Sequence, residues 1–191
     1  MGVEFELKYR LPQEALETIA AKMGPGAVFE METAYYDNPT RDFALRKWTL
    51  RRRMENGTSV CTLKTPMSDG SRGEWEVLAD SIEAGIPELC KLDIPAGLEN
   101  LAKDGLVQVC AARFTRLAKT ILLENATVEL ALDEGCLLGG GKTLPFAEVE
   151  VELKQGSETA AVDFASALAL EFDLTLEKKS KHRRALELTK N

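Results

Sequence analysis

The sequence predicts an α+β fold, mainly β, in which eight antiparallel strands close into a barrel with a charged interior and with helices packed outside. Three observations lead to this prediction: apolar and charged residues alternate along several segments, turn signals join neighbouring segments, and charges gather on one face of several strands. Alternation is the period of a strand, and hairpin connections are typical of antiparallel sheets. A length of 191 residues further predicts one domain, spanning 1–191.

Eight segments have the pattern of strands: 3–11, 28–37, 48–55, 58–65, 73–79, 114–123, 127–134 and 146–154. Four segments favour helical structure: 12–23, a short turn at 39–46, 81–104 with breaks at Pro87 and Pro95, and 157–172. Pro12 suits the first turn of a helix, and Asn56-Gly57 is a hairpin signal between the third and fourth strands. Gly139-Gly140-Gly141 predicts a flexible loop, and residues 176–190 form a charged tail.

Charges of like sign share strand faces. The first strand places four charged residues on one face: Glu4, Glu6, Lys8 and Arg10. On the last strand Glu148, Glu150 and Glu152 are aligned, and on the third Arg51 and Arg53. A solvated outer face explains any single strand. Like charges two residues apart repel, however, and the helices need an apolar surface to cover. We therefore expect the apolar faces outside, beneath the helices, and the charged faces inside.

A charged barrel interior indicates what it binds. Eight strands enclose enough room for side chains or one small ligand, and buried charges must be paired, bound to metal or filled. Carboxylate oxygens are the ligands that hard divalent cations prefer, and guanidinium groups bind phosphate through two parallel hydrogen bonds. The acidic and basic strands together predict a complex of a divalent metal with a polyphosphate.

The same residues resemble the CYTH superfamily, also called triphosphate tunnel metalloenzymes. Glu4-Phe5-Glu6-Leu7-Lys8 matches its ExExK signature, and Tyr35-Tyr36-Asp37-Asn38-Pro39 is similar to its Tyr-Asp-Thr-Pro element, with Asn38 in place of the usual Thr. Six further elements follow in order: Leu50-Arg51-Arg52-Arg53, Thr62-Leu63-Lys64, Arg72-Gly73-Glu74-Trp75-Glu76, Glu129 to Gly135, Glu148 to Glu152, and Ser180-Lys181-x-x-Arg184. The resemblance therefore spans residues 4–184.

The resemblance implies roles for these side chains. Basic residues would bind the triphosphate: Lys8, Arg51, Arg53, Lys64, Arg72, Arg116, Lys181 and Arg184. Carboxylates would hold Mg²⁺ or Mn²⁺: Glu4, Glu6, Asp133, Glu148, Glu150 and Glu152, the last as a ligand or as a partner of one. Tyr35 and Lys64 would form a catalytic pair, although Tyr35 could equally be a packed aromatic. Arg113 and Arg116 compete for one inward position, and the alternation that follows favours Arg116.

The most specific function that this resemblance implies is hydrolysis of inorganic triphosphate to pyrophosphate and phosphate. A class IV adenylate cyclase, or a thiamine or nucleoside triphosphatase, is the alternative, and a non-catalytic polyphosphate-binding module is a further one. No residue suggests contacts for a base or ribose, which favours the bare triphosphate. The long run of carboxylates argues against a binding module, since binding an anion does not require them.

Bulk properties exclude other classes of protein. A net charge of −7 argues against a nucleic-acid partner, and no apolar stretch approaches the ~20 residues that span a membrane. Four cysteines with no zinc or redox spacing, and no signal peptide, favour a cytoplasmic protein; oligomeric state stays open. His182 is the single histidine and is expected to be exposed, while Trp48 and Trp75 are expected to pack beneath helices.

We predict that Glu4→Gln and Glu6→Gln each lose most of the turnover while the protein still folds. Removing one carboxylate weakens metal binding and also relieves repulsion between like charges on the first strand. Thermal melting measured beside the assay checks both parts. An unchanged kcat at saturating metal would contradict the assignment of these residues.

Overall fold

The structure is a computed structural model and describes residues 5–68 and 72–190. Nine strands form one sheet: β1 (Phe5–Arg10), β2 (Ala27–Asp37), β3 (Thr49–Glu55), β4 (Thr58–Pro66), β5 (Arg72–Leu78), β6 (Val107–Leu122), β7 (Ala126–Gly139), β8 (Lys142–Gly156) and β9 (Thr175–Leu176). The helices are α1 (Gln13–Met23), α2 (Asp42–Leu45), α3 (Ile82–Cys90), α4 (Leu98–Ala102), α5 (Glu158–Glu171), α6 (Lys181–Glu187) and the 3-10 helix η1 (Leu188–Lys190). The first eight strands fall on the eight predicted segments.

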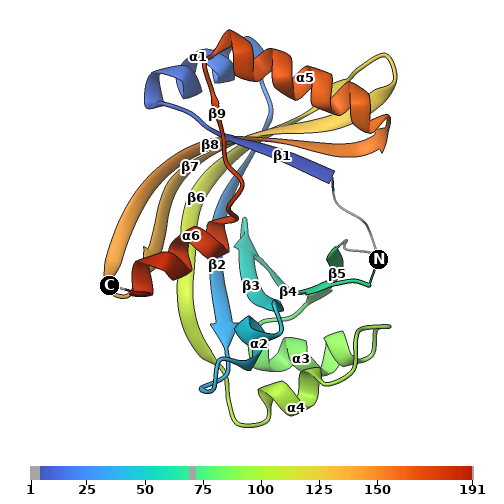
Figure 1. The fold of residues 1–191 in the computed structure, drawn as a ribbon, viewed down its shortest axis with the longest axis vertical. Coiled ribbons are helices and arrows are strands. Elements are labelled where there is room, and N and C mark those ends of the chain that lie inside the picture. The colour runs from blue at the N-terminus through green and yellow to red at the C-terminus, as the bar shows by residue number, and fades with distance from the viewer. Residues whose placement is uncertain (1–4, 69–71, 191) are drawn as a thin grey trace.

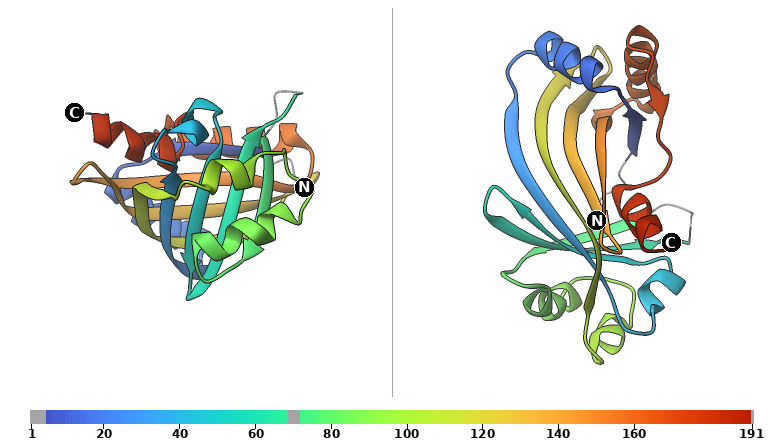
Figure 2. Two further views of the ribbon diagram at one scale, coloured as in Figure 1. Left: turned by 90° about the horizontal axis from the view of Figure 1, so that it is seen from below. Right: turned by 90° about the vertical axis from the view of Figure 1, so that its left-hand side faces the viewer.

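The strand order is β5-β4-β3-β2-β6-β7-β8-β1-β9, and neighbouring strands are antiparallel. Hairpins join β3, β4 and β5 on one side and β6, β7 and β8 on the other, and β2 links these sets by pairing with β3 and β6. The right panel of Figure 2 shows β3–β5 bending away from β6–β8. The sheet therefore has a strongly curved, concave side, which the C-terminal segment crosses.

The predicted closure into an eight-stranded barrel is wrong, because the sheet stays open. Within the ranges that the structure describes, β5 and β9 are its two outer strands. The free edge of β1 is taken by the C-terminal segment: β9 pairs with Tyr9 and Arg10, and the Glu177 N–H donates to the Lys8 carbonyl oxygen at 2.7 Å. These hydrogen bonds occupy the Lys8–Arg10 part of that edge, so β5 cannot pair with β1 there.

Apolar strand faces point outward beneath helices, as the alternation predicts. At one end, α1 and α5 cover a core from β1, β7 and β8, in which Val128, Val149 and Val151 are fully buried. Ile19 of α1 and Ala165 of α5 complete this core. Figure 1 shows these two helices side by side over one end of the sheet. Burial of this apolar surface holds that end together and leaves the opposite strand faces for the charged side chains.

The other end has its own core, between β3–β5 and the helices α3 and α4. Leu50 and Leu63 are fully buried there against Leu89 of α3. Trp48 and Trp75 belong to this cluster, which confirms that they pack beneath helices. The side chains Phe43 and Trp48 meet edge to face, with ring centroids 6.4 Å apart. The sheet is thus anchored at both ends by separate outer cores.

Several local predictions need correction. Helix α3 continues through Pro87 and ends at Cys90. The glycine run is the tight turn of the β7–β8 hairpin, since Gly139 pairs directly with Lys142. The charged tail contains β9, α6 and η1. Ser180 is the N-cap of helix α6, and its side chain accepts a hydrogen bond from the Arg183 N–H. Across the described part of the chain, none of the helices has the length and apolarity needed to cross a membrane.

Candidate functional site

A cavity of about 870 Å³ opens on the concave side of the sheet. Its walls come from strands β1 to β8 and from α6, so residues far apart in sequence converge on it. Most of the sequence-predicted site residues line it: Glu6, Lys8, Tyr35, Arg51, Arg53, Lys64, Arg72, Arg116, Glu150, Glu152 and Lys181. Asp133, Glu148 and Arg184 lie behind this lining, buried, and Glu4 falls outside the described residues.

One wall of the cavity is basic and is carried by β3, β4 and β5. Arg51, Arg53 and Lys64 all face it, in agreement with the alternation of those strands. Burial and the nearby charge of Arg51 lower the pKa of the Arg53 guanidinium, and both side chains line the cavity. Such a wall attracts an anion that can replace cation–cation repulsion with charge-assisted hydrogen bonds.

Two carboxylates of β5 hold this basic wall in place. Glu74 lies 2.9 Å from the Lys64 Nζ and 3.2 Å from the Arg51 Nη2. Glu76 accepts a hydrogen bond from the Thr62 hydroxyl at 2.9 Å. Neither was predicted as a site residue. The sequence pattern could have identified them, because alternation along the strand puts Glu74 and Glu76 on the same face as Arg72.

A row of three carboxylates faces the cavity from the opposite wall. The strand register pairs Glu6 of β1 with Glu152 of β8, and Glu152 with Glu129 of β7. All three side chains line the cavity. Lys154 partly neutralises them, since its Nζ lies 2.7 Å from Glu152 and 3.6 Å from Glu129. Glu129 was not predicted as a metal ligand, because one strand's pattern does not reveal which residues it meets on its neighbours.

This row, called the acidic row below, presents carboxylate oxygens to the cavity, although among the described residues only a second, buried group brings the ligand atoms of three acidic residues within 4.8 Å of one another. The oxygens of the acidic row are hard donors of the kind that Mg²⁺ and Mn²⁺ prefer, and they come from adjacent strands that hold them side by side. Their partial exposure to the cavity leaves them accessible to a metal that enters with the substrate.

A second acidic group is buried and already neutralised. Asp133, Glu148 and Glu150 place oxygens within 4.8 Å of one another, the one such group among the described residues. The Lys181 Nζ sits among them, 2.6 Å from Asp133 and 2.7 Å from Glu150, and also pairs with Glu148. These four residues are called the lysine cage below. The Lys181 ammonium group thus pairs with all three of the carboxylates that the family resemblance assigned to metal.

Two arginines complete the charge balance of the lysine cage. Arg116 donates to both Asp133 oxygens at 2.7 Å and pairs with Glu150, and Arg184 pairs with Glu148. Three cations therefore balance three carboxylates. Burial lowers the pKa of Lys181, but the three carboxylates outweigh it and the pKa is raised, so Lys181 stays charged. Burial raises the pKa of Glu150, but the charges of Lys181, Arg116 and Lys8 lower it by more. The net pKa is therefore lowered, and Glu150 stays ionised.

The competition between Arg113 and Arg116 is decided by the strand face. Arg116 points to the cavity, whereas Arg113 lies outside and pairs with Glu32 at 2.8 Å, with both side chains more than half exposed. The alternation into Ala118 and Thr120 already favoured this placement.

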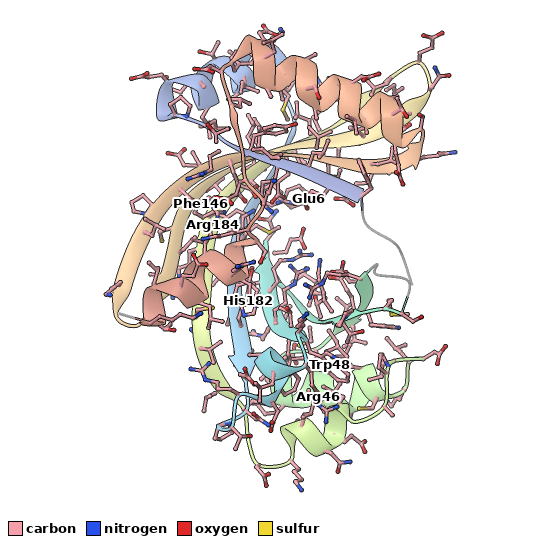
Figure 3. All side chains as sticks on the ribbon, viewed as in Figure 1. Glu6, Arg46, Trp48, Phe146, His182 and Arg184 are labelled. Atoms are coloured by element: carbon pink, nitrogen blue, oxygen red, sulfur yellow. The ribbon has the colours of Figure 1, made fainter. Side chains whose placement is uncertain are left out.

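His182 is not exposed as expected but is largely buried against Tyr35. Their ring centroids are 4.6 Å apart and the rings are nearly parallel, at 25°. Burial and the charge of Arg72 lower the pKa of His182 to about 4, so the imidazole is neutral near pH 7. The flanking charged residues hid this contact, because it exists only when α6 docks on the sheet. Figure 3 shows His182 and Arg184 on α6, with Glu6 on β1 nearby.

Tyr35 and Lys64 border the same cavity but stand on strands separated by β3. Tyr35 of β2 is opposite Arg51, and Lys64 of β4 is opposite Thr49. Burial raises the pKa of the Tyr35 phenol, which therefore keeps its proton near neutral pH. In this arrangement Tyr35 can donate a hydrogen bond at the cavity wall.

Comparison with protein families and sequences gives two results. A family model described as the CYTH domain matches residues 2–186. The inorganic triphosphatase of Haemophilus influenzae is 30% identical over 152 residues, which cover 78% of this chain and 43% of that protein. The chain thus spans less than half the length of this relative.

Comparison with solved structures supports the fold. A Hippeastrum protein, described as an adenylyl cyclase candidate with a dominant triphosphatase activity, has a TM-score of 0.72 at 21% identity, covering 98% of this chain and 97% of that one. An adenylate cyclase candidate from Bacillus halodurans has a TM-score of 0.66 at 19% identity, with 93% and 94% covered. A Pyrococcus horikoshii protein has a TM-score of 0.61 at 24% identity, with 97% and 99% covered. At these identities the likeness shows the fold alone.

We predict that Lys181→Met lowers the free energy of unfolding by about 3–5 kcal/mol, because it leaves buried carboxylates without their central cation. Chemical denaturation at pH 7 measures the change. Lys179→Met is the matched control: its partner Glu187 is 2.8 Å away, and both side chains are more than a third exposed. A surface pair of this kind contributes less than about 1 kcal/mol. Equal losses in the two variants would contradict the lysine cage.

Proposed function

Because the chain belongs to the CYTH domain family, we propose that it is a metal-dependent hydrolase of a triphosphate, with inorganic triphosphate as the substrate. The observation that carries the proposal is one cavity with a basic wall on β3–β5 and the acidic row on β1, β7 and β8. A polyphosphate needs the first and its divalent cation needs the second. The triphosphatase name of the Haemophilus influenzae relative supports the same choice of substrate class.

The basic wall binds and orients the substrate. Arg51, Arg53 and Lys64 come from two adjacent strands, so their nitrogens are held close together before the anion arrives. Phosphate oxygens would replace part of the contacts that these groups make with Glu74 and Glu76. Lys8, Arg116 and Lys181 add positive charge from the far wall. Positioning of this kind supplies much of the catalysis in phosphoryl transfer.

Glu6, Glu152 and Glu129 would hold the cation, with Glu4 as a further ligand. When bound, the cation supplies charge neutralisation on the phosphate oxygens and can lower the pKa of a water for in-line attack. Tyr35, protonated because its pKa is raised, donates a hydrogen bond toward the substrate from β2. Lys64, held by Glu74 at 2.9 Å, stabilises negative charge that develops on the leaving pyrophosphate.

A second candidate is a larger triphosphate, such as a nucleoside or thiamine triphosphate, including the class IV adenylate cyclase reaction. The size of the cavity favours it, since about 870 Å³ is near the upper end of the roughly 300–1,000 Å³ found for small-molecule sites. A bare triphosphate leaves part of this volume to water and metal. Met31, Phe114 and Leu153 supply the apolar part of the lining.

We expect hydrolysis of inorganic triphosphate to stop when a chelator removes divalent cations, and to return when Mg²⁺ or Mn²⁺ is added back. Lys8 and Lys154 pair with Glu6 and Glu152 as single charges, so a divalent cation would be needed to join the acidic row to phosphate oxygens. Released phosphate is measured with and without chelator, and circular dichroism checks that the protein stays folded. Full turnover in chelator would overturn the metal dependence.

Inorganic triphosphate should show a kcat/KM more than about tenfold above that of ATP, which corresponds to ~1.4 kcal/mol of transition-state free energy. Both substrates present the same terminal phosphoryl group, but most of the described lining is charged and suits phosphate and metal rather than a base. Steady-state kinetics with triphosphate, ATP and thiamine triphosphate decides this. Better use of ATP would favour the nucleotide enzyme, and pyrophosphate released with cyclic AMP would establish the cyclase. Tight binding of triphosphate without turnover would favour the non-catalytic polyphosphate-binding module.

A further inference from the structure

We propose that Gly139, at the tip of the β7–β8 hairpin, is a positioning residue for triphosphate binding. The absence of a side chain there lets the backbone of α6 dock against the hairpin, and this docking holds Lys181 in the cavity. The inference rests on the proposed function, since it concerns how one of the predicted phosphate-binding cations is placed. The glycine run would then position a helix, which is a different role from the flexible loop that the sequence predicts.

The close approach at Gly139 is to backbone. A Cβ added there would lie 2.3 Å from the Ala185 carbonyl oxygen, and also within 3.3 Å of Thr189 and Leu188 side-chain atoms. Atoms do not approach a Cβ this closely, and a backbone oxygen inside a helix cannot swing aside as a flexible side chain would. At the next position, a Cβ on Gly140 would lie 2.9 Å from the Leu188 carbonyl oxygen. We call this contact the glycine cradle, formed by Gly139 and Gly140.

Helix α6 depends on contacts of this kind. It has seven residues, and an isolated helix of that length is not stable in water. On one side the segment is held by the hydrogen bond that the Glu177 N–H donates to the Lys8 carbonyl oxygen of β1, at 2.7 Å. On the other side it is held by the glycine cradle. Ala185 is fully buried and belongs to one apolar cluster with Phe146 and Leu137. Loss of the cradle would therefore release the end of α6 that is farther from β1.

The position of Lys181 follows from that of Ala185. The two residues are four apart on α6 and so share one helix face. Lys181 faces both the lysine cage and the cavity, where its Nζ lies 2.7 Å from Glu150. Functional side chains must be held to within about 0.5 Å to act well. A displacement of α6 by the clash at Gly139 would move Lys181, and its neighbour His182, by more than that.

The hairpin offers a matched control. Gly139 is not in the left-handed region, so Gly139→Ala introduces the clash without backbone strain. Gly141 has φ +75° and nothing within 4 Å of an added Cβ, so Gly141→Ala introduces backbone strain without a clash. The two variants make the same chemical change two residues apart. A difference between them reports on docking of α6 and not on the hairpin turn.

The experiment measures triphosphate affinity by calorimetry, and KM and kcat with Mg²⁺, for the wild type and both variants. We expect Gly139→Ala to weaken triphosphate binding at least tenfold, and Gly141→Ala to change it less than threefold. The same two changes are then made in a Lys181→Met background, at a temperature where circular dichroism shows every protein folded. There Gly139→Ala should change affinity less than twofold, because its effect passes through Lys181. Wild-type affinity in Gly139→Ala, or an equal loss in both backgrounds, would overturn the proposal.

Amide hydrogen exchange separates this proposal from the proposed function. Exchange over residues 181–187 should be faster in Gly139→Ala than in Gly141→Ala, with or without triphosphate. If the wild type neither binds nor hydrolyses triphosphate, the proposed function is wrong. The proposed effect of Gly139 on triphosphate affinity is then wrong as well. Should Gly139→Ala fail to fold, Leu188→Ala keeps the Cβ that lies near Gly139 but removes the rest of a side chain that packs the same segment against the apolar cluster. It should then weaken binding at least threefold, and unchanged binding and exchange would count against the cradle.

Discussion

Neutralisation of inward-facing charge is the constraint on which the rest of this structure depends. The strands turn carboxylates to the concave side, and Asp133 and Glu148 are fully buried there. An unpaired buried charge is strongly unfavourable, so each must meet a cation. The cations come from β6 and from α6, through Arg116, Lys181 and Arg184. Folding of the sheet is therefore coupled to docking of the C-terminal segment, which is far away in sequence.

The carboxylates consequently divide into two groups with different physical roles. Those of the lysine cage are buried, balanced by cations and fixed in place, and they anchor α6. Those of the acidic row are partly exposed to the cavity, on the residues Glu6, Glu152 and Glu129. A divalent cation that entered the cavity would meet the second group at the cavity surface, whereas the first group is buried. The strand face alone does not separate the two groups, because Glu150 and Glu152 stand on the same face of β8 only two residues apart. Burial separates them, since Glu150 is buried and Glu152 is partly exposed.

The open sheet places the two halves of the candidate site on strands that are far apart in the strand order. The basic wall is carried by β3–β5 and the acidic row by β1, β7 and β8, and they are joined through β2 and β6. Each half has its own outer core, one beneath α1 and α5 and the other beneath α3 and α4. A ligand that carries both phosphate and metal would contact both halves. Its binding would add a link across the concave side that the strand pairing does not provide.

The sequence by itself determined the faces of the strands, because a side-chain period of two specifies which residues share a face. It therefore predicted the outward Trp48 and Trp75, the inward Arg51 and Arg53, and most of the charged residues that line the cavity. It could not determine which strands become neighbours or whether the edges meet, because these depend on long-range pairing. Only the tertiary structure aligned Glu129 with Glu152, left the sheet open, and laid α6 over it. The stack of His182 on Tyr35 and the close approach at Gly139 were decided there too, since a short, charged helix has no structure of its own until the sheet supplies its partners.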